Sequence, residues 1–491
     1  MTEESNSVVS RRSLLQAGAG LLLATALPPF PARAASPDGY RIIAAPARAR
    51  LVGPDQPETD VWTYNGTVPG SLVRLRQGEP ARLLVENRIA QETTVHWHGI
   101  RLPNSMDGVP GLTQPPIKAG ERFVYEFTPP DAGTFWYHPH ANSLEQLGRG
   151  LAGAVIVEER EPAAVDQDLL WLLSDWRLTE DGGIASRFGN RMEAAMSGRV
   201  GNTVTLNGRV SAAEGVRAGE RVRLRLLNAS LARIMALRFV GHRPVVVAVD
   251  GQPCDPHESE GGRILLGPAM RVDVMLDMQG EPGRRYDVID DFYDGLSYRL
   301  TQLAYDQRPP IRGHSLDAPL ELPRNPLPEP DLASAERHML ALEGGMMSMG
   351  GMSDMGGMMG GGMMGGGGMM GGGMMGMAHG AVWSINGQSM TGDGHAGMEP
   401  ALVFERGGSV VLELRNQTAW WHPMHIHGHS LRVLSRNGKP VPHRQWQDTV
   451  LVAPKDAVEV AFVADNPGDW MLHCHVIDHQ MTGMMTVLRV A

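Results

Sequence analysis

The sequence is poor in cysteine, in aromatic residues and in basic clusters. It has two cysteines among 491 residues, 5% aromatic residues and a net charge of −10. Two thiols are too few for a disulfide-rich scaffold, and a structural zinc site would more often take two to four thiolates at one place. The absence of a Lys/Arg cluster argues against nucleic acid as a partner. Beyond the N-terminal region no apolar run reaches the ~20 residues of a spanning helix, so we expect no stable membrane insertion of the mature chain.

Glycine and proline, by contrast, are abundant. The chain has 60 Gly and 35 Pro, and long uninterrupted helical patterns are few. This composition favours an all-β protein that is rich in turns. At roughly 150 residues per domain, the length favours about three domains.

The first 35 residues read as an export signal. SRRSLL at 10–15 is a twin-arginine pattern, an apolar run follows, and ARA at 32–34 has the pattern of a cleavage site. A membrane anchor is the alternative, but the apolar run is shorter than the ~20 residues needed to span a bilayer. We therefore expect residues 1–35 to be a cleaved signal peptide. It would deliver the folded chain to the periplasm through the twin-arginine export machinery.

One segment occurs three times along the chain. In each copy a glycine precedes an asparagine by nine residues: Gly78 and Asn87, Gly219 and Asn228, Gly407 and Asn416. Apolar and polar residues alternate between them, as in half-buried strands. A repeat of this length with such strands fits a β-sandwich. We predict three homologous domains at roughly 40–160, 165–308 and 330–491.

Two of the three copies carry paired histidines at matching positions. The pairs are His96 and His98, His138 and His140, His425 and His427, and His473 and His475. The middle copy has Leu237 and Phe239 where its neighbours have the first pair. Alternate residues of a strand face the same side, so each pair directs two imidazoles to one place. Eight imidazoles are too many for one ion and indicate a cluster of three, built across the interface of the outer domains.

A second set of metal-binding side chains lies near the C-terminus. It consists of His422, Cys474, His479 and Met484. Two histidines, one cysteine and a weak axial methionine are typical of a blue-copper electron-transfer centre. His473 and His475 would face the opposite side of the strand from Cys474, so only a few covalent bonds separate this centre from the cluster. A four-electron acceptor such as O₂ fits this layout.

A disulfide is another use of two cysteines in an exported protein. If Cys474 binds a metal, however, Cys254 has no partner.

The chain resembles the multicopper oxidases of the three-domain laccase and cuprous-oxidase kind. It carries HWHG at 96–99, HPH at 138–140, HPMHIHG at 422–428 and HCHVIDHQMTGM at 473–484. The resemblance implies three consecutive cupredoxin-like Greek-key β-sandwiches, four copper ions and O₂ as the acceptor. It places the type 1 copper on His422, Cys474, His479 and Met484, and the type 2 copper on His96 and His425. The type 3 pair would be held by His98, His138, His140, His427, His473 and His475.

The resemblance also implies an acidic residue that delivers protons to the cluster. Asp107 in NSMDG matches it, although an Asp before a Gly is equally natural in a turn. A second carboxylate of the family, directly after the last type 1 histidine, is Gln480 here. An amide cannot carry a proton as a carboxylate does, so we expect slower O₂ reduction than in a Glu-bearing relative.

Residues 346–377 consist almost entirely of Met and Gly, with fourteen methionines. Thioethers are soft, uncharged ligands that suit Cu(I). A low-complexity linker is the alternative interpretation. Copper-efflux oxidases of the family hold substrate copper with a Met and an Asp five residues later, which Met349 and Asp354 match. They also use an Asp and a Met before the first type 1 histidine, where this chain has Thr418 and Trp420.

Three functions therefore compete. The favoured one is an exported cuprous oxidase that couples oxidation of Cu(I) to reduction of O₂ to water in copper detoxification. The second is a broad-specificity laccase that takes electrons from small organic reductants such as phenols or aromatic amines. The third, of another class, is a periplasmic copper-buffering protein, which gives no reason for a three-ion cluster.

Overall fold

The protein is described here from a computed structural model. It describes residues 39–211, 213–313, 320–346, 381–392, 395 and 397–491. The predicted signal peptide at 1–35 lies outside these ranges, as does the predicted insert at 346–377 apart from Met346. The two predicted substrate-copper residues, Met349 and Asp354, also lie outside them. Within the described ranges no helix is both long enough and apolar enough to cross a membrane.

The first repeat folds into two β-sheets with the strand orders β2-β1-β4-β6 and β3-β8-β7-β5. The strands are β1 (Tyr40–Ala49), β2 (Thr59–Tyr64), β3 (Gly70–Arg76), β4 (Ala81–Asn87), β5 (His96–His98), β6 (Arg122–Phe127), β7 (Gly133–His138) and β8 (Gly153–Glu158). Apolar side chains of both sheets form one core that includes Leu83, Val73 and Phe135. In β4 alternate residues are buried, as the period-2 pattern predicts.

The second repeat has the sheets β10-β9-β12-β17-β14-β15 and β11-β19-β18-β13-β16. The strands are β9 (Gln167–Trp176), β10 (Thr203–Leu206), β11 (Glu214–Val216), β12 (Arg221–Asn228), β13 (Met235–Phe239), β14 (Val245–Val249), β15 (Gln252–Glu258), β16 (Arg263–Leu266), β17 (Arg271–Asp277), β18 (Arg285–Asp290) and β19 (Tyr298–Tyr305). Every residue of β12 is buried, and three of them are arginines. This repeat therefore buries several charges at its boundary with the others.

The third repeat has the sheets β21-β20-β24-β30-β26-β27, with β28 paired to β26, and β23-β33-β31-β25-β29. This repeat also contains a small two-stranded sheet of β22 and β32. The strands are β20 (Glu336–Gly344), β21 (Trp383–Ile385), β22 (Met390–Thr391), β23 (Leu402–Phe404), β24 (Ser409–Asn416), β25 (His422–Ile426), β26 (Leu431–Arg436), β27 (Lys439–Pro440), β28 (Trp446–Gln447), β29 (Thr449–Val452), β30 (Ala457–Val463), β31 (Gly468–Cys474), β32 (Thr482–Gly483) and β33 (Met485–Val490).

Within the described ranges, helices are few and short. They are η2 (Asn104–Met106), α1 (Ser143–Gly148), α2 (Arg191–Ala194), η3 (Glu260–Gly262) and α5 (Ile477–Met481). The all-β fold class predicted from composition is thus confirmed.

The glycine–asparagine segment has the same structure in each repeat. The glycines have positive φ angles of 78°, 82° and 83°, which turn the chain into β4, β12 and β24. Each strand ends at the repeated asparagine, whose amide group donates to backbone carbonyls and whose Oδ1 accepts from the N–H two residues later. In every repeat the opening strand pairs in parallel with this strand. A parallel neighbour requires a crossover connection, as in a Greek key.

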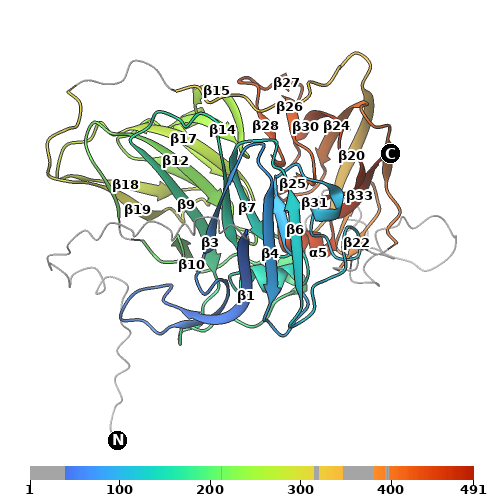
Figure 1. The fold of residues 1–491 in the computed structure, drawn as a ribbon, viewed down its shortest axis with the longest axis horizontal. Helices are drawn as coiled ribbons and strands as arrows, with labels where there is room; N and C mark the ends of the chain where they lie inside the picture. The colour runs from blue at the N-terminus through green and yellow to red at the C-terminus, as the bar shows by residue number, and fades with distance from the viewer. Residues whose placement is uncertain (1–38, 212, 314–319, 347–380, 393–394, 396) are drawn as a thin grey trace, which may run out of the picture.

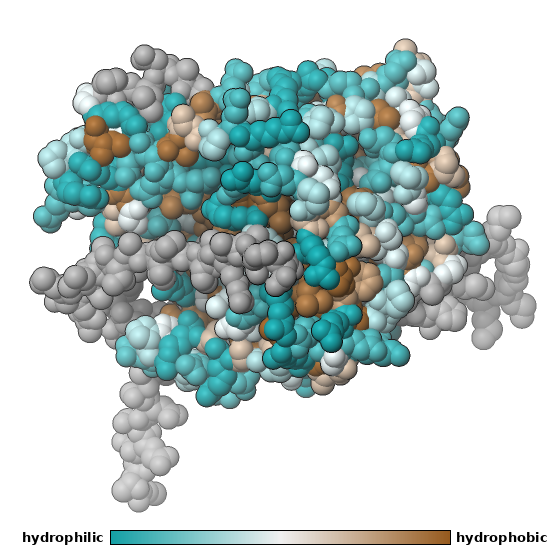
Figure 2. Space-filling view, in the orientation of Figure 1, coloured by the Kyte–Doolittle hydropathy of each residue, from teal (hydrophilic) through white to brown (hydrophobic). Residues whose placement is uncertain are grey.

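The three repeats are packed around a common centre. Figure 1 shows the second repeat in green and yellow and the third in orange and red, on either side of the first in blue and cyan. Each two-sheet unit lies within one of the ranges 40–160, 165–308 and 330–491, whose exact limits stay predictions. The face drawn in Figure 2 is mainly hydrophilic, with smaller apolar areas near its middle. The paired histidines are all buried where the first and third repeats meet.

Candidate metal centre

Four strands place the paired histidines at the boundary of the first and third repeats. In the first repeat, β5 pairs with β7 and sets His96 opposite His138. In the third, β25 pairs with β31 and sets His425 opposite His473. Because a strand directs alternate residues to one face, the second member of each pair follows the first toward the same place.

The paired histidines assemble into three groups. In each group the ligand nitrogens lie within 4.8 Å of one another, and all side chains are buried. The first group is His96, His98 and His425, the second is His98, His138 and His475, and the third is His140, His427 and His473. Every group combines residues of both outer repeats.

The spacing of the nitrogens fits metal ions. The Nε2 atoms of His427 and His473 lie 3.1 Å apart, and those of His96 and His425 lie 3.4 Å apart. The Nε2 atom of His138 lies 3.4 Å from Nδ1 of His98. Two nitrogens bound at about 2 Å to one ion with a tetrahedral angle are themselves about 3.3 Å apart. The groups therefore have the separations that coordination requires.

The charge state of these imidazoles also suits a metal. Burial lowers the pKa of nine histidines below the ordinary value of 6.5: His98, His138, His140, His422, His425, His427, His473, His475 and His479. For His479 the pKa falls to about 3. A neutral imidazole has a free lone pair, which is the form that binds a metal.

Two buried aspartates hold the ring nitrogens that face away from the groups. Asp107 accepts from Nδ1 of His427 through Oδ2 at 2.8 Å, and its backbone carbonyl lies 2.8 Å from Nδ1 of His96. Asp448 Oδ1 lies 3.0 Å from Nε2 of His98, and the backbone carbonyl of Asp448 lies 2.9 Å from Nδ1 of His425. Such partners fix the ring orientation and the tautomer of a metal-binding histidine.

Asp107 was expected near the cluster from the sequence, but Asp448 was not. Asp448 lies between β28 and β29, and no repeat signal marks it. The one available sign was an acidic residue beside the apolar strand TVLV. Burial raises the pKa of Asp448, but the Arg271 guanidinium and the His425 ring together lower it by more, so the net pKa lies below the ordinary range. Burial and the Asp448 charge together raise the pKa of Asp250, which also contacts Arg271, to about 7.

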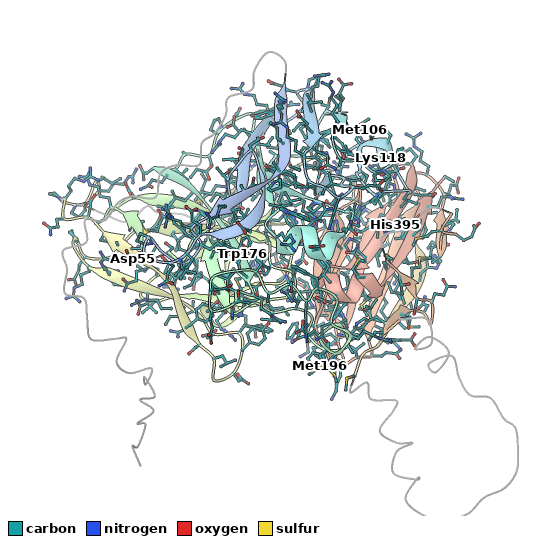
Figure 3. The ribbon with its side chains drawn as sticks, turned by 90° about the horizontal axis from the view of Figure 1, so that it is seen from below. Asp55, Met106, Lys118, Trp176, Met196 and His395 are labelled. Carbon is teal, nitrogen blue, oxygen red and sulfur yellow. The ribbon has the colours of Figure 1, made fainter. Side chains whose placement is uncertain are left out.

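His395 is another residue that the sequence left unassigned. Its side chain is buried and lies in the third repeat (Figure 3). Its ring centroid lies 5.9 Å from that of His140. Nδ1 of His395 lies 3.1 Å from the carbonyl oxygen of Pro110. The structure thus brings it to the edge of the third group.

The fourth set forms a separate cysteine–histidine site of His422, Cys474 and His479. The Sγ atom of Cys474 lies 3.5 Å from Nδ1 of His422 and 3.6 Å from Nδ1 of His479. The outer Nε2 atoms contact Oγ1 of Thr418 at 2.8 Å and the carbonyl of Met196 at 2.8 Å. Both rings therefore turn Nδ1 toward the thiol. Met196 belongs to the second repeat and contacts His479 of the third, so it lies where these repeats meet (Figure 3).

Cys474 itself is fully buried and forms no disulfide, like Cys254. Burial raises the pKa of its thiol, so a metal cation would have to displace the proton on binding. Met484 is buried. Its N–H donates a hydrogen bond to the carbonyl of His479, and its own carbonyl accepts one from the N–H of Cys474. His473 and His475 belong to the third and second histidine groups, so one tripeptide connects both kinds of site.

Comparisons with known proteins agree with this geometry. Three segments, residues 48–162, 167–301 and 374–491, match family profiles that are each described as multicopper oxidase. The multicopper oxidase MmcO of Mycobacterium tuberculosis is 30% identical, over 93% of this chain and 89% of that protein. A crystal structure of a multi-copper oxidase from Pseudomonas thermotolerans is 35% identical, with a TM-score of 0.78, and covers 92% of this chain and 98% of its own. A Campylobacter jejuni multicopper oxidase described as a metallo-oxidase is 26% identical, with a TM-score of 0.73, over 95% and 94% of the two chains.

The fold is therefore that of three cupredoxin-like domains, and copper is the metal that the family implies. With its histidine groups, its cysteine–histidine site and these full-length relatives, the chain belongs to the multicopper oxidases, which are oxidoreductases.

Proposed function

We propose that this enzyme is a cuprous oxidase that couples oxidation of Cu(I) to reduction of O₂ to water. The reaction is 4 Cu⁺ + O₂ + 4 H⁺ → 4 Cu²⁺ + 2 H₂O. Four resident copper ions, when bound, supply one-electron acceptance from the reductant and four-electron reduction of O₂. The product Cu(II) crosses membranes less readily than Cu(I), so the reaction would serve copper detoxification. Export to the periplasm, proposed from residues 1–35, would place it where that copper arrives.

The resident ions are assigned to the four sets of side chains. The type 1 copper is assigned to His422, Cys474, His479 and Met484, and the type 2 copper to His96 and His425. The type 3 pair is assigned to His98, His138 and His475 for one ion, and to His140, His427 and His473 for the other. The short nitrogen separations and the neutral, buried rings support this assignment.

Asp107 is the proposed proton-delivering residue. Its two carboxylate oxygens lie 3.2 Å from Nδ1 of His96 and 2.8 Å from Nδ1 of His427, one histidine from each outer repeat. Reduction of O₂ to water consumes protons at the cluster, and a buried carboxylate within hydrogen-bond reach can supply them. Gln480 stands where relatives carry the second carboxylate, so Asp107 would carry more of this task.

One observation favours Cu(I) over organic reductants. The described residues on both sides of the methionine-rich segment lie against the cysteine–histidine site. Met346 donates its N–H to the carbonyl of Ala195 at 2.7 Å, one residue from Met196, whose carbonyl contacts His479. On the C-terminal side of the segment, the ring centroids of Trp383 and His479 lie 4.3 Å apart.

The segment with fourteen thioethers is therefore flanked by residues that lie close to the proposed type 1 site, where electrons would enter. Soft thioethers bind Cu(I) and ignore hard cations such as Mg²⁺. Met349 and Asp354 remain the proposed substrate-copper residues within this segment. A laccase would have no use for thioethers here, and a copper buffer would not need the three histidine groups.

The test compares Cu(I) oxidation with phenol oxidation by the fully copper-loaded enzyme. One variant lacks residues 347–377. A second variant keeps the length of this segment but has every methionine in it changed to serine, which separates loss of the thioethers from loss of the segment. Both should lose about tenfold in kcat/KM for Cu(I), since both lose the thioethers that bind it. Phenol oxidation should stay unchanged in the serine variant and stay unchanged or rise in the deletion.

Two other outcomes would separate the alternatives. Poor Cu(I) oxidation by all three proteins, with fast phenol oxidation, would identify a laccase. Copper binding without any O₂ consumption would identify a buffering protein.

A further inference from the structure

The middle repeat carries a fully buried cation at its interface with the histidine groups. Arg271 is the first residue of β17, and its side chain is 0% exposed. Burying a guanidinium costs several kcal/mol unless acceptors surround it. A repeat that contributes no paired histidine therefore maintains a charge at the centre of the molecule, and its contacts show why.

The guanidinium of Arg271 joins all three repeats. Two of its nitrogens donate to the two carboxylate oxygens of Asp448 in the third repeat, with Nη1 to Oδ1 at 2.8 Å. Nε donates to the carbonyl of Thr134, on β7 of the first repeat, at 3.1 Å. Nη1 also donates to the carbonyl of Ala269 at 3.1 Å. A planar fork of this kind fixes a carboxylate in one orientation, which a lysine cannot do.

Asp250 of the middle repeat fixes the backbone on either side of this ion pair. Its Oδ1 accepts from the N–H of Arg271 at 2.9 Å, and its Oδ2 accepts from the N–H of Thr449 at 3.0 Å. The peptide that carries Asp448 and Thr449 is therefore held by the middle repeat through both a side chain and the main chain.

Asp448 and Thr449 in turn hold two histidines from different repeats. Nε2 of His98 lies 3.0 Å from Oδ1 of Asp448 and 3.1 Å from Oγ1 of Thr449. The His98 and His425 rings are stacked, with centroids 3.7 Å apart, and Nδ1 of His425 contacts the carbonyl of Asp448. Arg271 thus acts one residue away from two members of the first histidine group.

Gly99 shows how tightly the ion pair is built against the ligand strand. This glycine directly follows His98, and its φ angle is +84°. A Cβ atom there would lie 2.4 Å from Nη2 of Arg271 and 2.4 Å from Oδ2 of Asp448. The final glycine of HWHG is thus needed to make room for the arginine–aspartate pair as well as for its own backbone conformation.

We propose that Arg271 is a positioning residue of the copper cluster, which orients His98 and His425 by locking Asp448. The inference rests on the proposed copper assignment. The other aspartate differs, because the ion-pair partners of Asp107 within the described ranges are histidines alone. The middle repeat thus contributes to the centre through a cation in place of ligands.

The test measures copper affinity as well as activity. Arg271→Lys keeps the charge but loses the fork, and Arg223→Lys is the matched control. Arg223 is also buried in the middle repeat, where it pairs with Asp273 and Glu159 and contacts no histidine of the groups. Copper is titrated out with a chelator while the type 2 signal is followed by electron paramagnetic resonance. The blue absorption of the Cys474 site reports folding in the same samples.

Arg271→Lys should lose type 2 copper at about tenfold lower chelator concentration, the lower end of the effect of losing an outer partner of a ligand. Arg223→Lys should keep wild-type affinity, and both should stay blue. Equal type 2 affinity in Arg271→Lys and the wild type would overturn the inference. If Arg271→Lys does not fold, Gly99→Ala, which displaces the pair while retaining the arginine, decides by the same criteria. A wild-type protein that takes up no copper would instead refute the proposed function.

Discussion

Most histidines of the centre direct one ring nitrogen toward the proposed metal position and place the other within hydrogen-bond distance of a protein oxygen. His427 does so with Asp107, His98 with Asp448 and His422 with Thr418. His98 differs from His96, His425 and His427, because it turns Nδ1 toward its group and Nε2 toward Asp448. The His-x-His spacing predicts which residues converge, but it carries no information on which nitrogen each uses. That choice depends on outer partners, and some of these, such as Asp107 for His427 and Asp448 for His98, come from distant parts of the chain.

Gln480 is the residue whose exchange should change the rate of O₂ reduction. It lies buried on α5, and within the described part of the chain neither of its amide atoms has a hydrogen-bond partner. We expect Gln480→Glu to raise the rate of reoxidation of the reduced enzyme by O₂ by about tenfold. This is less than a general acid can contribute, because Asp107 is already the proposed proton donor to the cluster.

Stopped-flow reoxidation of the fully reduced enzyme measures this rate. Gln480→Met is the control, because it removes the amide without adding an acid and should not accelerate the reaction. No acceleration in Gln480→Glu, with copper content unchanged, would show that protons reach the cluster by another route.

At the scale of elements, strand periodicity predicted most of the centre. Four His-x-His pairs lie on or directly after β5, β7, β25 and β31, and the Gly–Asn segments form the same turn and strand in every repeat. Asp448 and Arg271 could not be predicted in this way. Asp448 lies directly before a strand, and Arg271 is the first residue of one. Arg122 occupies the position of Arg271 in the first repeat, but the role of Arg271 depends on packing between repeats, which a comparison of the repeats does not show. A single charged residue next to an apolar strand indicates that the residue is buried, but it does not indicate which residue pairs with it.

At the scale of the whole molecule, the centre links folding to pH. Nine buried histidines have a pKa below 6.5, so between 6.5 and their lowered values the unfolded chain binds more protons than the folded one. Stability from these groups is full above pH 6.5 and is lost as the pH falls. Four carboxylates act in the opposite sense, because burial raises the pKa of each: Asp175, Glu214, Asp250 (to about 7) and Asp478 (to about 6). They are four groups against nine.

The copper-free protein should therefore unfold more easily in mild acid. Each histidine contributes up to about 1.4 kcal/mol per pH unit in that window, so Tm should fall steeply between about pH 7 and pH 5. Differential scanning calorimetry of the copper-free protein at several pH values measures this dependence. A Tm that stays constant over this range would mean that the histidines are protonated or exposed before unfolding.

The proposed function requires four electrons from Cu(I) for each O₂ that is reduced to water, and the stoichiometry of the reaction measures this number. The copper-loaded enzyme is mixed with excess Cu(I) in a closed oxygen-electrode cell. Both the O₂ consumed and the Cu(II) formed are measured, and hydrogen peroxide is assayed. We expect four Cu(I) ions to be oxidised per O₂ molecule and no peroxide to form. Two Cu(I) ions per O₂ with accumulating peroxide would contradict this expectation, because the three histidine groups would then not act as one four-electron centre.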